Sequence, residues 1–99
     1  MKVNVQSVNF NIDKDLMDFI EKKVNNLEKY YDQIVDSDVY LKVQQTSEKE
    51  NKHIDIRLNI PGNDLVVKKQ SKTFEEGVMM AADSLKRQLT KKKEKVRSK

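Results

Sequence analysis

The chain lacks cysteine and tryptophan, and it has only one histidine, one proline and two glycines among its 99 residues. Without cysteine there is no disulfide framework and no thiolate for catalysis or metal binding. Two glycines cannot build the glycine-rich loop that cradles phosphates in nucleotide-binding proteins. His53 stands at the open end of a predicted strand beside a charged loop, where a surface role is expected rather than that of a base. We therefore predict a protein that is not an enzyme, with no catalytic residue, no metal, no cofactor and no small-molecule substrate.

Long apolar runs are missing as well. No segment approaches the roughly 20 apolar residues of a membrane span, and the N-terminus lacks the apolar core of a signal peptide. These absences predict a cytoplasmic protein without a membrane partner. The length suits one domain with a modest core, so we expect residues 1–99 to form a single domain, with about the last five residues frayed at the helix end.

Charge is distributed unevenly along the chain. Residues 84–99 hold eight Lys or Arg residues and one Glu, a local charge of +7, whereas residues 1–83 hold twelve basic and fifteen acidic residues, a charge of −3. A strongly basic end on a mildly acidic body indicates a polyanionic partner, most often nucleic acid. A solvated helix face is the alternative interpretation of such a charge run.

Alternation of apolar and polar residues predicts four strands. They cover residues 2–8, 38–46, 53–60 and 65–70. The third is the clearest, since every second residue from Ile54 to Ile60 is apolar, and the Pro61–Asp64 segment that follows has turn chemistry. In the fourth strand Lys69 interrupts the inward face, so we expect that strand to be shortened there.

Two helices are predicted from apolar spacings of three and four. The first covers residues 14–31, with Asp13 as its N-cap. The second begins at Thr73, which forms a capping box with Glu76. Gly77 costs helix propensity, and we attribute its presence to a close approach of this helix to the sheet. The order β-α-β-β-β-α predicts an α+β fold, a two-layer sandwich with a four-stranded sheet and both helices on one of its faces.

Rows of cations follow from the helical periodicity. Arg87, Lys91 and Lys95 recur at i, i+4 and i+8 on the side of the last helix that faces away from the core. Lys22 and Lys29 share the exposed side of the first helix, and the two rows would meet if the helices lie side by side. Structured RNA, DNA and an anionic membrane all fit such a face. The absence of helix-turn-helix spacing disfavours DNA, and the use of the apolar stripe by the core disfavours a membrane.

Two stretches resemble a known family. Residues 26–34 (NLEKYYDQI) with residues 39–43 (VYLKV), and residues 85–95 (LKRQLTKKKEK), are similar to the first helix, second strand and basic last helix of the hibernation-promoting factor and ribosome-associated inhibitor family. The resemblance implies a fold similar to double-stranded-RNA-binding domains. It also implies binding to the small ribosomal subunit (30S) and its 16S rRNA, in the mRNA and tRNA channel near the A and P sites. Such members inhibit translation and stabilise idle 70S ribosomes in stationary phase or stress.

The resemblance and the cation rows together predict the RNA-binding residues. Lys22 comes from the geometry of the first helix alone, and Lys86 lies beside the matched cations of the last helix. The resemblance places the others where the family carries cations or polar residues. The sequence has no segment resembling the C-terminal dimerisation domain of long members and no extended acidic tail, which favours the short, dimer-promoting type. A general double-stranded-RNA-binding module and a protein-interaction module remain the alternatives. The predicted residues are Lys22, Lys23, Lys29, Lys86, Arg87, Lys91, Lys93 and Lys95.

Overall fold

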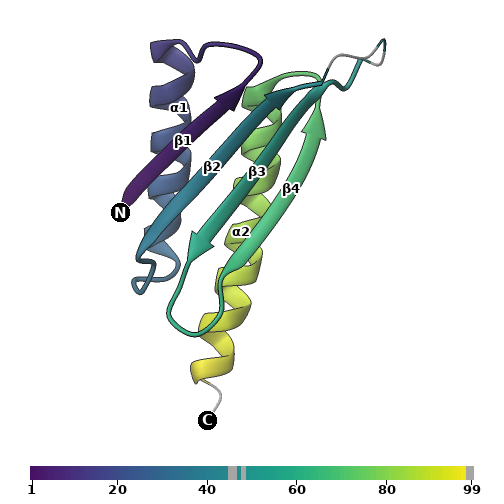
Figure 1. Cartoon of the computed structure of the whole chain (residues 1–99). Helices are drawn as coiled ribbons and strands as arrows, with labels where there is room; N and C mark the ends of the chain where they lie inside the picture. Colours follow the sequence, from purple (N-terminus) through teal and green to yellow (C-terminus); the bar gives the residue numbers. More distant parts are fainter. Residues whose placement is uncertain (45–46, 48, 98–99) are drawn as a thin grey trace.

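A four-stranded sheet and two long helices make up the fold, which we describe from a computed structural model. The structure describes residues 1–44, 47 and 49–97, with the backbone alone for residues 94–97. The elements follow one another in the predicted β-α-β-β-β-α order (Figure 1). Their bounds are β1 (Lys2–Val8), α1 (Lys14–Asn25), the 3-10 helix η1 (Asn26–Lys29), β2 (Asp36–Val43), β3 (Lys52–Asn59), β4 (Leu65–Ser71) and α2 (Phe74–Arg97).

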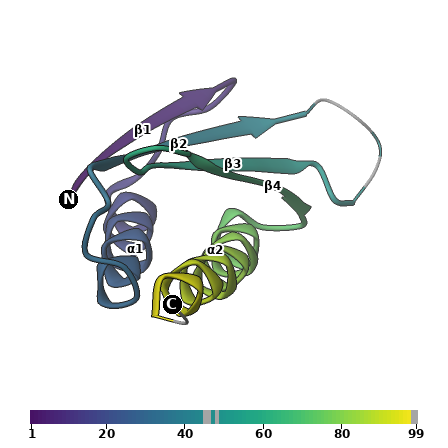
Figure 2. The ribbon, with the colours of Figure 1, turned by 90° about the horizontal axis from the view of Figure 1, so that it is seen from below.

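The strands lie in the sheet in their sequence order, β1-β2-β3-β4. β1 pairs with β2 in parallel, and the other two pairings are antiparallel. A parallel pair needs a crossover connection, and α1 provides it. Figure 2 shows both helices on the same side of the sheet, which confirms the predicted two-layer α+β sandwich.

Alternate residues of the central strands and one stripe of each helix form the core between the layers. Burying a Leu or Ile side chain contributes about 1.5–3 kcal/mol, so this shared interior is the main source of stability. The alternating apolar residues from Ile54 to Ile60 are confirmed as core residues, and so is the apolar stripe of the last helix from Phe74 to Leu89, whereas Met79 and Met80 are exposed. Core residues with no exposed surface include Ile20, Val24, Leu41, Ile54, Ile56, Leu58, Val78, Ala81, Leu85 and Leu89.

Both predicted helix caps have side-chain hydrogen bonds in the structure. The Asp13 carboxylate accepts from the Leu16 backbone N–H at 2.8 Å. The Thr73 hydroxyl oxygen accepts from the Glu76 backbone N–H at 3.2 Å. Each bond satisfies one backbone donor that a helix start leaves unpaired, which explains why the helices begin at these residues.

The predicted end of the first helix is wrong. We expected one helix as far as Tyr31, but α1 ends at Asn25 and a 3-10 turn, η1, covers Asn26–Lys29. Asn has a lower helix propensity than Ala, Leu or Lys, and two Asn residues meet at this junction. The tighter turn closes when the Tyr30 backbone N–H donates to the Leu27 carbonyl at 3.0 Å. It buries Leu27 and brings Tyr30 and Tyr31 against the core.

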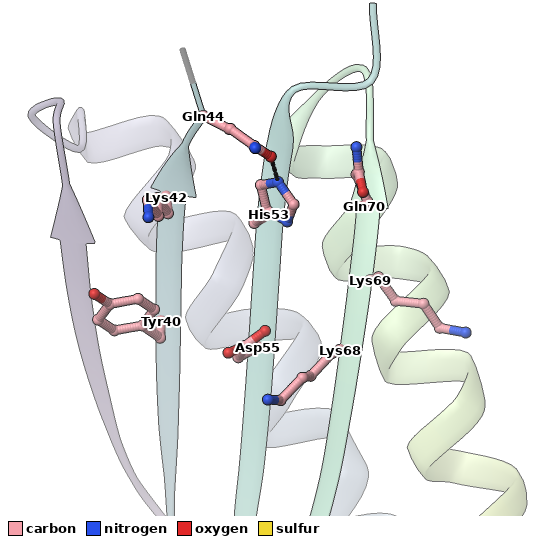
Figure 3. Close-up of a pocket in the computed structure, with 8 residues that line it drawn as sticks. All are labelled: Tyr40, Lys42, Gln44, His53, Asp55, Lys68, Lys69 and Gln70. Carbon is pink, nitrogen blue, oxygen red and sulfur yellow. Dashed lines mark hydrogen bonds between the residues drawn. The ribbon is translucent and has the colours of Figure 1, made fainter. Parts of the chain in front are cut away.

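Two strand predictions also need correction. The second strand runs from Asp36 to Val43 rather than from residue 38 to residue 46, and residues 45 and 46 lie outside the described residues. Ser37 joins it because its buried hydroxyl donates to the Arg57 carbonyl at 3.0 Å. The fourth strand continues to Ser71 and is not shortened by Lys69. Since β4 lies at the sheet edge, the Lys69 side chain extends outward past that edge (Figure 3).

The predicted close approach at Gly77 is confirmed. A Cβ atom at this position would lie 2.0 Å from Ile54 Cδ1 and 2.8 Å from Ser71 Oγ. Contacts this short are far inside van der Waals distance. The glycine therefore allows the first turns of α2 to pack directly on β3 and β4.

We predict a small acid-dependent contribution to stability from an ion pair near the β3–β4 turn. The Asp64 carboxylate accepts from the Arg57 guanidinium at 2.5 Å and from the Ile60 backbone N–H at 3.2 Å. These bonds, the Arg57 contact first, hold the pKa of Asp64 below its usual range. Its stabilisation is therefore complete above the ordinary carboxyl pKa and is lost as the pH falls through the lowered value. Thermal unfolding should show a lower Tm for Asp64→Asn than for the natural chain at pH 7, and the difference should shrink as the pH falls below the ordinary carboxyl pKa of about 4. A difference that persists at low pH would contradict this assignment.

Candidate nucleic-acid interface

The two helices run in the same direction, and their charges are sorted along that direction. Both begin at the same end of the molecule and run towards the other end, which α2 reaches (Figure 1). Acidic residues occupy the first turns, Asp15 in α1 and Glu75 and Glu76 in α2, whereas Lys22 and Lys23 lie in the last turn of α1. Cations near a helix C-terminus interact favourably with the helix dipole. The helix layer therefore has an acidic end and a strongly basic end.

The predicted cations that the structure describes all lie on this helix layer. Lys22 and Lys29 are exposed on α1 and η1, whereas Lys23 is half-buried. α1 and α2 contact each other directly, so the cations of both helices belong to one surface. Lys95 belongs to α2, but its side chain lies outside the described residues. The exposed cations of α2 are Lys86, Arg87, Lys91 and Lys93. We call these described cations, with Lys92, the cationic layer.

The alignment of Lys22 with Lys29 differs from the expected helical row. A 3-10 helix turns about 120° per residue instead of about 100°. Since η1 replaces the last α-helical turn, Lys29 is rotated relative to Lys22. Both side chains remain exposed, but they do not form the i, i+7 row that an uninterrupted helix would give.

Three lysines lie over aromatic rings on the helix layer. Lys23 Nζ is 5.6 Å from the ring centroid of Phe19 within α1. Across the seam between the helices, Lys86 Nζ is 5.1 Å from the Tyr30 centroid and Lys92 Nζ is 6.0 Å from the Tyr31 centroid. Each cation–π contact of this exposed kind contributes about 0.5–1 kcal/mol.

Lys92 is a cation of this surface that the sequence reasoning missed. Helical angles place it close to the apolar stripe of Leu85 and Leu89, so the periodicity assigns it to the inner side. The adjacent Tyr30 and Tyr31 were the sequence signal for this contact. Two aromatic rings directly after a helix are expected to pack against another element. The structure supplies that partner from α2.

The outer side of α2 carries a shallow pocket of about 450 Å³. Arg87 lies there with its guanidinium 3.7 Å from Asp83, and both side chains are more than half exposed. Such an ion pair contributes little to stability, so the guanidinium stays available to another anion. The pocket combines cations with hydroxyl and amide groups that suit phosphate and ribose oxygens. Its lining residues are Ser84, Lys86, Arg87, Gln88, Thr90 and Lys91.

The outer face of the sheet is also polar, but its charges are balanced. Figure 3 shows a second shallow pocket there, of about 470 Å³, with Tyr40, Asp55 and Lys68 on neighbouring strands. His53 contacts the side-chain oxygen of Gln44 and lies at a strand end, as predicted. The face holds four cations and, with the adjoining turn, four carboxylates, so its field is weak beside that of the cationic layer. These are Lys2, Lys42, Arg57 and Lys68, with Asp36, Asp38, Asp55 and Asp64.

Metal sites and membrane spans are the other features to consider in the part of the chain that the structure describes. Within it, no group of three or more histidine, aspartate or glutamate side chains is placed to hold a metal ion. Among its helices, none has the length and apolarity needed to cross a membrane. The cationic layer is therefore the strongest candidate site among the described residues.

The chain is similar to proteins of a known family. Residues 3–97 match a family described as Sigma 54 modulation protein / S30EA ribosomal protein. The ribosome hibernation promotion factor of Bacillus subtilis is 31% identical over 101 residues, which cover 100% of this chain and 52% of that protein. The ribosome hibernation promoting factor of Pseudomonas putida is 30% identical over 98 residues, covering 99% and 92%. The chain thus spans about half the length of the first relative and nearly all of the second.

Two solved structures share the fold. An N-terminal domain of Protein Y from Thermus thermophilus superposes with a TM-score of 0.78 at 23% identity, covering 92% of this chain and 98% of that domain. A ribosomal subunit interface protein from Coxiella burnetii gives a TM-score of 0.81 at 22% identity, with 94% and 98% covered. At these identities the likeness concerns the arrangement of the sheet and helices.

Proposed function

Because the chain belongs to the family of Sigma 54 modulation and S30EA ribosomal proteins, we propose that it is a ribosome hibernation factor. Residues 1–99 act as a ribosome-binding domain in the cytoplasm. They bind the small subunit through 16S rRNA, in the channel for mRNA and tRNA near the A and P sites. Binding there blocks translation and stabilises idle 70S ribosomes in stationary phase or stress. The names of the B. subtilis and P. putida relatives support ribosome hibernation.

The observation that carries this proposal is the concentration of cations on one rigid face. Lys22, Lys29, Arg87, Lys91 and Lys93 are exposed on neighbouring helices whose inner stripes are locked into the core. Cations held on a rigid scaffold match RNA phosphates without a large ordering cost. Affinity then comes largely from the release of counterions. The opposite face, with balanced charge, lacks this advantage.

Sedimentation through sucrose gradients tests the proposal. The protein is mixed with 30S subunits, 50S subunits or 70S ribosomes at 50 and 200 mM salt. We expect co-migration with 30S and 70S but not with 50S, and a loss of binding as salt rises. A heavier peak from 70S ribosomes would identify the dimer-promoting type. If the protein co-migrates with neither 30S nor 70S even at 50 mM salt, the proposal is contradicted.

A competition experiment separates ribosome binding from general recognition of double-stranded RNA. Shape-based binding to any duplex would let a free RNA duplex displace the protein from 30S subunits at equal phosphate concentration. We expect no displacement under these conditions, because the proposed site is a channel with RNA on several sides. Ready displacement would favour the general double-stranded-RNA-binding module instead.

A further inference from the structure

The seam between η1 and α2 holds two lysine–tyrosine pairs that the proposed function leaves unexplained. Lys86 lies over Tyr30, and Lys92 lies over Tyr31. Both rings are half-buried and packed against the core, so their positions are fixed by the fold. Lys86 and Lys92 stand six residues apart, which is about 9 Å along the axis of α2. The rings thus hold two ammonium groups at a defined spacing.

An aromatic ring orders a cation without cancelling its charge. A carboxylate partner would also hold a lysine in place, but it would neutralise the charge that a polyanion needs. Within the described residues, neither Lys86 nor Lys92 forms an ion pair, although the chain has 16 acidic residues. A face of the ring attracts the ammonium group through its quadrupole, and the N–H donors that point away from the ring stay free. A lysine side chain loses much rotamer entropy when it becomes ordered. Because the ring already orders the side chain, part of this entropic cost is met before a ligand binds.

We propose that this seam is a subsite for the RNA phosphodiester backbone, in which Lys86 and Lys92 bind phosphates and Tyr30 and Tyr31 are positioning residues. The inference rests on the proposed function, since the ligand is the same RNA. It assigns phosphate binding to Lys92 within the cationic layer and gives the two tyrosines a role in affinity. Both rings directly follow η1, so the 3-10 turn sets their position beside α2.

A double-mutant cycle on 30S binding tests the Tyr30–Lys86 pair. Lys86→Met removes one phosphate contact, so the slope of log affinity against log salt should fall by about one. Tyr30→Leu keeps all charges, and we expect it to weaken binding about two- to fivefold, the range of an exposed cation–π contact, with little change in slope. In the Lys86→Met background, Tyr30→Leu should have no further effect. Tyr30→Phe, which keeps the ring, should bind like the natural chain.

The same cycle applies to Tyr31→Leu and Lys92→Met, with Tyr31→Phe as its control. The melting temperature of each variant is measured in parallel, and binding is measured well below it. If Tyr30→Leu weakens binding equally with and without Lys86, the tyrosine acts through the fold or on the RNA itself, and the positioning role is wrong. A further variant replaces Arg87 and Lys91 by Glu. If the substitutions of both cycles leave 30S binding unchanged while this charge reversal abolishes it, the proposed subsite is wrong and the proposed function stands. If the charge reversal of Arg87 and Lys91 also leaves 30S binding unchanged, the cationic layer is not the ribosome-binding surface.

Discussion

Replacing Arg87 and Lys91 together by Glu should weaken binding to 30S subunits by about a hundredfold or more, since two phosphate contacts become repulsive. Both side chains are exposed on the outer side of α2, away from Leu85 and Leu89. The fold should therefore survive, with circular dichroism and Tm close to those of the natural chain. Fluorescence anisotropy of a labelled protein with 30S subunits, at several salt concentrations, measures the loss.

The matched control places the same change of charge on the opposite face. Lys42 and Lys68 are exposed on the outer side of the sheet, and replacing both by Glu alters the net charge by the same amount. We expect this control to bind within a few-fold of the natural chain. Equal losses in the two variants would mean that binding follows net charge rather than the cationic layer. If the variant with Glu at positions 87 and 91 binds as tightly as the natural chain, the cationic layer is not part of the interface.

Gly77→Ala should destabilise the protein, because overpacking a core usually costs about 1–3 kcal/mol. The added methyl group meets Ile54 and Ser71 at contacts shorter than 3 Å, and Ile54 is fully buried. Replacing Gly by Ala inside a helix offsets up to about 1 kcal/mol of this cost, so we expect a net destabilisation of up to about 2 kcal/mol. For a domain of this size each kcal/mol lowers Tm by about 4–8 °C. Thermal and urea unfolding measure the change.

A compensating substitution identifies the cause of this destabilisation. Ile54→Val removes the Cδ1 atom that lies nearest to the new methyl group, at a cost of about 0.5–1.5 kcal/mol on its own. The double variant should therefore be less destabilised than the sum of the two single variants. Strict additivity would show that the contact with Ile54 is not the source of the effect.

Local patterns predicted those parts of the fold that local chemistry determines. Asp13 and Thr73 begin helices because their side chains bond backbone donors three residues on. The alternation from Ile54 to Ile60 is that of a strand buried on one face. The confirmed contact at Gly77 also had a local signal, because a glycine within a helical pattern needs a reason.

Features that depend on partners far away in the sequence were not predicted. The parallel pairing of β1 with β2 joins Val5 to Val39, and nothing in either segment specifies that neighbour. The 3-10 turn at Asn26 is favoured by the burial of Leu27, which periodicity alone counts as one more helical residue. Lys92 was missed for the same reason, since its contact with Tyr31 exists only once α2 lies beside η1.

Both helices have acidic residues near their first turns and basic residues near their last turns. This arrangement gives the molecule a permanent dipole moment along its length. The molecule is 50 Å long, about six Debye lengths at physiological salt, where that length is roughly 8 Å. An approaching RNA therefore acts on the nearer end almost independently of the far one. In the proposed function, the field of the RNA would turn the basic C-terminal end of α2 to the front before contact, so that many encounters would begin in the binding orientation. Salt then slows association through the loss of this steering.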